Sequence, residues 1–229
     1  NRVHVVHNGI ELNGFGPPPP SPQPPAVGYL ARMCHAKGLD TLAAAFVILK
    51  QRGRIEQLKL QVIGACTAAD QPFVNQVKQR LADGRVLQDV TFYPNVSFDR
   101  KVELLHTLSV LSVPATYGEA FGLYVLEALA AGVPVVQPNH GAFPELLGRA
   151  GGGILCEPDD PQSLADGLES ILLRPDRRAF GLQGRAEVLQ NFSVERMAQE
   201  VLQVFQQSLY NSSESEDLCK AAELQDLCN

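Results

Sequence analysis

The sequence lacks long hydrophobic runs and an excess of positive charge. A helix that crosses a bilayer needs about eighteen or more consecutive apolar residues, and the 229-residue chain has no such stretch. We therefore expect no membrane span. The formal net charge is −6, and the basic patch of a typical nucleic-acid-binding protein is absent. The sequence thus argues against nucleic acid as a partner.

Cysteine is scarce and irregularly placed. The chain has five cysteines, an odd number, at Cys34, Cys66, Cys156, Cys219 and Cys228. Their spacing matches neither a disulfide framework nor a zinc site. We therefore predict a reducing, cytoplasmic location and no bound metal.

Length and composition indicate one sizeable domain. A chain of 229 residues with 45% hydrophobic residues can bury a single core. Seven prolines lie within residues 16–25, which predicts a stiff surface loop. Residues 211–229 carry five acids and one lysine, a net of −4. We predict a domain over 1–210 and a separate acidic tail over 211–229, to which the sequence gives no role.

Apolar runs alternate with helical patterns along the domain. An entry strand is expected within residues 3–10, and a terminal helix over about 194–209, with Ser193 as its N-cap. Six further strands are expected over 27–30, 58–63, 90–93, 108–113, 133–137 and 153–156. Alternation of this kind is typical of an α/β, Rossmann-like, three-layer αβα domain with a mainly parallel six-stranded sheet. Such sheets bind ligands beyond their strand C-termini.

The segment 117–136 combines a turn, two acids and a helix. The run 108–113 leads into a turn that contains Glu119, and a helix follows Gly122. The first turn of a helix favours an anion, because its N–H groups have no intrahelical partners. Glu127 is expected about 7.5 Å along the helix from Gly122. One extended, phosphate-bearing ligand would reach both acids.

Two acids beside a phosphate require cations to balance their charge. Arg32 and Lys37 lie in the loop that follows the strand 27–30. A bidentate guanidinium and an ammonium suit a diphosphate. Taken singly, each is more often an ordinary surface cation, but together with the two glutamates they favour a binding function.

These motifs together resemble a known family. The glutamates Glu119 and Glu127, the segment 131–136, the segment 141–145 and the Arg32/Lys37 loop are similar to the retaining glycosyltransferases of family 4, also called group 1. The resemblance runs from about Val3 to Gln207. It implies one half of a two-domain GT-B fold, namely the C-terminal domain that binds the nucleotide-sugar donor, without the N-terminal acceptor domain.

The resemblance also implies roles for individual residues. Arg32, Lys37 and Glu119 would be catalytic, the two cations by binding the diphosphate and Glu119 by contacting the transferred sugar. Glu127 would bind the ribose, and the loop at Asn95 and Val96 would border the base. Donor contacts are expected from Arg32, Lys37, Asn95, Val96, Glu119, Ala120, Phe121, Gly122, Leu123, Tyr124 and Glu127.

Several further expectations follow from the family. No Asp-x-Asp motif occurs, which agrees with a metal-independent enzyme that needs no cofactor. The donor is a nucleoside diphosphate sugar, with uracil, guanine or adenine as alternatives for its base, and the acceptor is a glycan, a lipid or a small molecule. The isolated domain is expected to be inactive. In the full-length protein, the inner face of a membrane is an alternative location.

The sequence leaves two alternative functions. A dinucleotide-dependent dehydrogenase is disfavoured, because the glycine fingerprint G-x-G-x-x-G does not follow the first strands. The second alternative is a non-catalytic nucleotide or protein-interaction domain that keeps the Rossmann-like fold.

Overall fold

The computed structural model describes residues 3–20 and 22–209. The chain divides into two compact units. The larger comprises residues 12–191, and the smaller combines the two ends of the chain, of which 3–11 and 192–209 are described. The predicted acidic tail over 211–229 lies outside the described residues.

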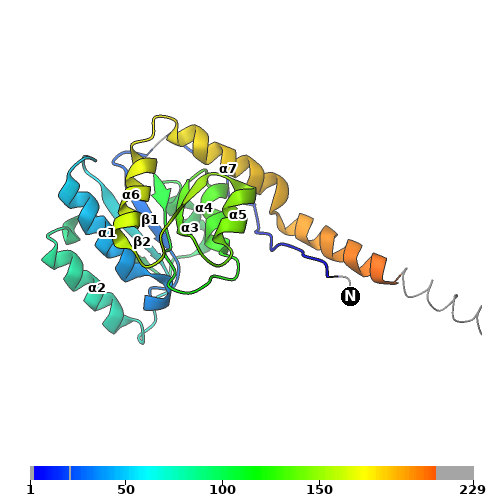
Figure 1. Cartoon of the computed structure of the whole chain (residues 1–229), viewed down its shortest axis with the longest axis horizontal. Coiled ribbons are helices and arrows are strands. Elements are labelled where there is room, and N and C mark those ends of the chain that lie inside the picture. The colour runs from blue at the N-terminus through cyan, green and yellow to red at the C-terminus, as the bar shows by residue number, and fades with distance from the viewer. Residues whose placement is uncertain (1–2, 21, 210–229) are drawn as a thin grey trace, which may run out of the picture. The chain divides into compact units, whose positions relative to one another are not determined.

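The larger unit is built on one parallel sheet of six strands (Figure 1). The strands lie in the order β3-β2-β1-β4-β5-β6, and every neighbouring pair is parallel. They are β1 (Ala26–Leu30), β2 (Lys59–Gly64), β3 (Val90–Pro94), β4 (Val110–Leu111), β5 (Val135–Pro138) and β6 (Gly153–Cys156). This confirms the predicted α/β, Rossmann-like class.

Helices cover both faces of the sheet. They are α1 (Leu39–Arg52), α2 (Gln71–Asp83), α3 (Phe98–Leu105), α4 (Leu123–Ala130), α5 (Phe143–Ala150), α6 (Pro161–Leu172) and α7 (Arg177–Asn191), with 3-10 turns η1 (His35–Lys37) and η2 (Leu87–Asp89). With right-handed crossovers, this strand order places α1 and α2 on one face and α3, α4 and α5 on the other. Helix α6 packs against α1, whereas α7 packs against α4 and α5.

The core lies where the central strands meet these two helical layers. All five residues of β1 are buried, since its neighbours β2 and β4 protect both edges and helices cover both faces. Tyr29 of β1, Phe46 of α1 and Phe143 of α5 are each fully buried. A strand covered on both faces is apolar throughout, which is why β1 was recognisable in the sequence.

The predicted strand positions agree with the structure within a few residues, with two exceptions. The run 108–113 is wholly buried, but only Val110 and Leu111 pair as β4. The expected entry strand over 3–10 was wrong, because only an isolated bridge between Ile10 and Ser193 forms there. The Ile10 carbonyl accepts from the N–H of Val194 at 3.1 Å, and the Ile10 N–H donates to the Phe192 carbonyl at 2.9 Å, so this segment forms one bridge and no ladder.

The terminal helix is present over residues 194–209, within the smaller unit. As predicted, Ser193 caps it: its hydroxyl accepts from the N–H of Arg196 at 3.2 Å. Of the helices within 3–20 and 22–209, none is long and apolar enough to cross a membrane.

Candidate donor-binding site

The sequence-predicted site residues follow different strands but come to one edge of the sheet. Arg32 and Lys37 follow β1, Asn95 follows β3, and Glu119 follows β4. All strands are parallel, so their carboxyl ends share this edge. The chain leaves β1 toward β2 on one side and returns to β4 on the other, which makes the β1/β4 boundary the topological switch point. Open α/β sheets bind their ligands there.

Lys37 and Glu119 meet at this switch point. The Lys37 Nζ lies 2.5 Å from Glu119 Oε2, although the two residues come from different βα connections. Both side chains are largely buried, with exposed fractions of 21% and 12%. The structure thus brings together the cation and the acid that the sequence assigned to one ligand.

Burial and pairing act in opposite directions on this pair. Burial lowers the pKa of the Lys37 ammonium, but its hydrogen bonds to Glu119 and Tyr117 outweigh this effect and raise the pKa. Burial likewise raises the pKa of the Glu119 carboxyl, and the bonds from Lys37 and Tyr124 reverse the sign and lower it. Both groups are therefore charged at neutral pH.

Two tyrosines complete the cluster. The Tyr124 hydroxyl donates to Glu119 Oε2 at 3.1 Å, and Lys37 Nζ donates to the Tyr117 hydroxyl at 2.5 Å. The ammonium also lies 5.0 Å and 5.6 Å from the centres of the Tyr117 and Tyr124 rings, within the range of a cation–π contact. The sequence had offered Tyr124 for its backbone amide only.

Helix α4 begins beside the cluster. Gly122 is its N-cap with φ 88°, ψ 61°, a left-handed conformation that glycine adopts readily. Leu123 and Tyr124 are its first two residues, and in helix geometry their N–H groups have no intrahelical acceptor. Leu123 is 46% exposed, Ala120 is exposed and Phe121 is half-buried. The first turn of α4 thus adds backbone donors next to Lys37.

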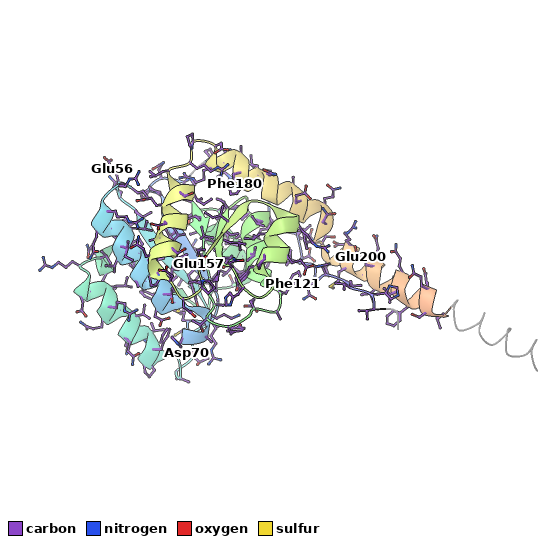
Figure 2. The ribbon with its side chains drawn as sticks, in the orientation of Figure 1. Glu56, Asp70, Phe121, Glu157, Phe180 and Glu200 are labelled. Atoms are coloured by element: carbon purple, nitrogen blue, oxygen red, sulfur yellow. The ribbon has the colours of Figure 1, made fainter. Side chains whose placement is uncertain are left out.

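Arg32 has a partner that the sequence did not predict. Its Nε lies 3.0 Å and 3.2 Å from the two carboxylate oxygens of Asp70, and its Nη2 lies 2.9 Å from Oδ1. Asp70 directly precedes α2 (Figure 2). The sequence signal there is a helix start before Gln71, which says nothing about an arginine in another loop.

Glu127 is placed apart from the Lys37–Glu119 pair. It lies on α4 and bonds to Lys101 of α3, with Nζ to Oε1 at 2.7 Å. Both side chains are 20% exposed. Its contact is therefore to a neighbouring helix, and its expected contact with a ribose stays a prediction.

The Asn95 side chain is hydrogen-bonded to the loop after β2. Its side-chain oxygen accepts from the N–H of Cys66 at 3.0 Å, and its amide nitrogen donates to the Cys66 carbonyl at 2.9 Å. This ties the end of β3 to the loop after β2. Val96 beside it is half-buried. Unlike Asn95, its side chain makes no hydrogen bond to this loop, because valine has no polar side-chain atom.

Backbone contacts fix the loops that present the cluster. Gly38 follows Lys37 with φ 69°, and a Cβ there would meet the Pro114 carbonyl oxygen at 1.7 Å. The Ala142 N–H donates to the Glu119 carbonyl at 2.9 Å, and a ring nitrogen of His140 lies 2.9 Å from the Ala115 carbonyl. The loop after β5 therefore supports the loop that carries Glu119.

Comparison with known proteins assigns the chain to a family. The sequence profile of the family described as "Glycosyl transferases group 1" matches residues 16–186. The chain belongs to this family. The match includes both the Arg32/Lys37 loop and the Glu119 loop, and it confirms the resemblance that the sequence motifs indicated.

This member of the group 1 family also has similar relatives and solved structures. D-inositol 3-phosphate glycosyltransferase of Xylanimonas cellulosilytica is 29% identical over 224 residues, which cover 91% of this chain and 52% of that protein. Sucrose-phosphate synthase from Thermosynechococcus elongatus has a TM-score of 0.78 and 26% identity, covering 91% of this chain and 53% of the other. HepE from Anabaena, in a complex with UDP and glucose, has a TM-score of 0.76 and 21% identity, covering 89% and 56%.

The chain thus spans about half the length of the relatives it matches. Among the residues that the structure describes, no group of three or more His, Cys, Asp or Glu side chains is placed to hold a metal ion.

Proposed function

We propose that this chain is the donor domain of a retaining glycosyltransferase and that it binds a nucleoside diphosphate sugar at the carboxyl edge of its sheet. The observation that carries the proposal is the meeting of Lys37 and Glu119 at the switch point, 2.5 Å apart. The first turn of α4 lies beside them, since Tyr124 of that turn bonds to Glu119. An ammonium and free helix N–H groups form an anion site.

Each side chain has a proposed role in this complex. Lys37 and Arg32 bind the diphosphate, together with the backbone of residues 122–124. Glu119 contacts hydroxyls of the transferred sugar, and Glu127 contacts the ribose. Lys37 is bound to Glu119 in the structure. The arriving phosphate therefore takes over part of the hydrogen bonding of Lys37, and the sugar hydroxyls become new partners for Glu119.

The chemistry that follows requires stabilisation of a leaving group. The bond between the sugar C1 and the diphosphate oxygen breaks, and its electron pair leaves with the phosphate. The acceptor oxygen bonds to C1 on the same face, and its proton passes to the departing phosphate. Cations and amides fixed around the leaving phosphate lower this barrier, because negative charge grows there. We propose that these groups serve without a metal or another cofactor.

Similar proteins support the ligand class. The HepE structure contains UDP and glucose, and the Xylanimonas relative is named a D-inositol 3-phosphate glycosyltransferase. For this chain, UDP, GDP and ADP remain alternatives for the nucleotide. We further propose that an N-terminal half binds the acceptor, because the chain spans about half of its relatives. The isolated chain is then expected to bind donor with negligible turnover.

Calorimetric titration of the chain with UDP, GDP and ADP tests this proposal. We expect one nucleotide to bind, and Lys37→Gln to weaken that binding about tenfold or more, since it removes a charge-assisted hydrogen bond. Lys59→Gln is the matched control: Lys59 also pairs with a carboxylate, Asp89 at 2.7 Å, but stands at the opposite edge, where β2 begins. The proposal fails if no nucleotide binds or if both variants bind equally well.

A further inference from the structure

Asp70 is a buried acid outside the predicted site. Its carboxylate is 5% exposed, whereas the Arg32 side chain with which it pairs is 55% exposed. Asp70 stands in the connection after β2, and Arg32 in the connection after β1. These strands are neighbours, so Asp70 and Arg32 come together at the same sheet edge as Lys37 and Glu119.

The Asp70 carboxylate is itself held in place. Its Oδ2 accepts from the Thr67 N–H at 2.8 Å and from the Thr67 hydroxyl at 2.7 Å. The hydrogen bonds from Arg32, followed by those from Thr67, hold the pKa of Asp70 at about 2. A carboxylate that is charged and anchored in this way is a rigid acceptor.

This anchoring determines the direction of the guanidinium. Arg32 uses Nε and Nη2 toward Asp70, which occupies one edge of the planar group. Its remaining N–H groups lie on the other edges, and the side chain is more than half exposed. The backbone is fixed as well, because the buried Tyr29 donates its hydroxyl to the Arg32 carbonyl at 2.7 Å.

An arginine on a loop ordinarily loses much rotamer freedom when it binds a ligand. Holding it beforehand reduces that entropic cost, which strengthens binding without a new contact to the ligand. The Asp70 charge lies on the side of the guanidinium away from its unused N–H groups. The Asp70 carboxylate therefore orients the guanidinium. It also lies farther from an incoming phosphate than the guanidinium does.

We propose that Asp70 is a positioning residue for the donor diphosphate, acting by holding the Arg32 guanidinium with its unused edge toward the phosphate. This inference rests on the proposed function. A purely structural role, in which Asp70 only ties the start of α2 to the neighbouring loop, is the competing explanation. The two differ in whether the effect of Asp70 on binding depends on Arg32.

A double-mutant cycle on the full chain separates them. Binding of the nucleotide that the wild type prefers among UDP, GDP and ADP is measured for Asp70→Asn, Arg32→Gln and the double variant. Asn keeps the size and one oxygen of Asp but removes the charge. We expect each single variant to bind about tenfold more weakly and the double variant to bind no more weakly than Arg32→Gln alone.

Asp176 supplies the matched control. It pairs with Arg174 in the same manner, Nε to Oδ1 at 2.7 Å and Nη2 to Oδ2 at 3.2 Å. It lies between α6 and α7, at the opposite edge of the sheet, because α6 runs back from the carboxyl end of β6. Asp176→Asn is expected to bind nucleotide as the wild type does.

The outcomes are distinct. Wild-type affinity in Asp70→Asn, or an equal loss in the wild-type and Arg32→Gln backgrounds, overturns the positioning role while leaving the proposed function intact. If the wild type binds no nucleotide, both proposals fail. If circular dichroism shows that Asp70→Asn is unfolded, Thr67→Val replaces it, because it removes one hydrogen bond to Asp70. A loss of nucleotide binding that occurs with Arg32 present but not in Arg32→Gln supports the positioning role. Unchanged binding overturns it.

Discussion

At the scale of single residues, the backbone conformation of Gly38 fixes the loop that carries Lys37. Its φ is 69°, and an added Cβ would lie 1.7 Å from the Pro114 carbonyl oxygen. We expect Gly38→Ala to destabilise the fold by about 3 kcal/mol or more, from left-handed strain plus a backbone clash. Gly53, which ends α1 with φ 64°, has open space around it, so Gly53→Ala is expected to cost only about 1 kcal/mol. Urea unfolding of both variants checks this; similar losses would contradict it.

The lowered pKa of the Asp70 carboxyl predicts how the stability of the fold depends on pH. Its pKa is about 2 in the folded chain and about 3.9 in an unfolded one. A depressed folded-state pKa means that ionisation stabilises the fold above the unfolded value, and that this stabilisation is lost as pH falls through the folded value. The wild type should therefore exceed Asp70→Asn in unfolding free energy by a constant amount from about pH 7 to 5. The difference should shrink between about pH 4 and 2.

Denaturant unfolding of both proteins at pH 7, 5, 4 and 3 measures that difference. Asp176→Asn provides a comparison, because the pKa of Asp176 is also lowered by its arginine while its side chain is 58% exposed. Solvent screens such an exposed pair, so its pH dependence should be weaker. A wild-type advantage over Asp70→Asn that does not change down to pH 3 would refute the linkage.

At the scale of elements, the glycines of α7 show packing overriding helix propensity. A Cβ on Gly181 would meet the Gly132 carbonyl oxygen at 2.2 Å, whereas Gly148 of α5 has nothing within 4 Å. Propensity alone favours alanine in both helices by up to about 1 kcal/mol. We expect Gly148→Ala to stabilise by about 0.5–1 kcal/mol and Gly181→Ala to destabilise by about 1–3 kcal/mol. Thermal unfolding of the two variants should show shifts of opposite sign, and shifts of the same sign would refute the packing argument.

Some of the secondary-structure elements were predictable from sequence patterns, and others were not. The buried strand β1 and the cap at Ser193 were predictable, since apolar runs and capping residues act locally. The pairing length of β4 was not, because residues 108–113 are buried throughout but only two of them meet neighbours in register. The entry segment looked strand-like, yet pairing needs a partner strand, and only the bridge from Ile10 to Ser193 forms.

At the scale of the whole molecule, donor binding is expected to raise thermal stability. A ligand at about 100 times its Kd adds about 2.7 kcal/mol, which corresponds to a rise of about 5–10 °C for a unit of this size. We expect this with one of UDP, GDP and ADP and expect no shift with NADH. A shift with NADH alone would favour a dinucleotide-binding function.

Sugar transfer by the whole protein is expected to depend on Glu119. In a two-domain protein that contains this chain, Glu119→Gln should lower sugar transfer by about 100-fold, since under the proposed function it removes a charge beside the reacting carbon. Released nucleotide measures the rate, and NMR of the product tests whether the anomeric configuration is retained. Unchanged transfer would favour the non-catalytic interaction domain instead.

The alternation of strands and helices, and the order of the motifs along it, follow from local patterns in the amino-acid chain. In a parallel sheet every connection after a strand starts at the same end of the sheet, so Lys37 and Glu119 were predicted to lie at that end, and the neighbouring positions of β1 and β4 in the sheet bring them together. The partners of the charged side chains, in contrast, depend on how the folded elements pack. Arg32 pairs with Asp70 and Glu127 with Lys101, 38 and 26 residues apart. The physical reason is that an ion pair depends on the relative placement of neighbouring elements, which no local pattern encodes.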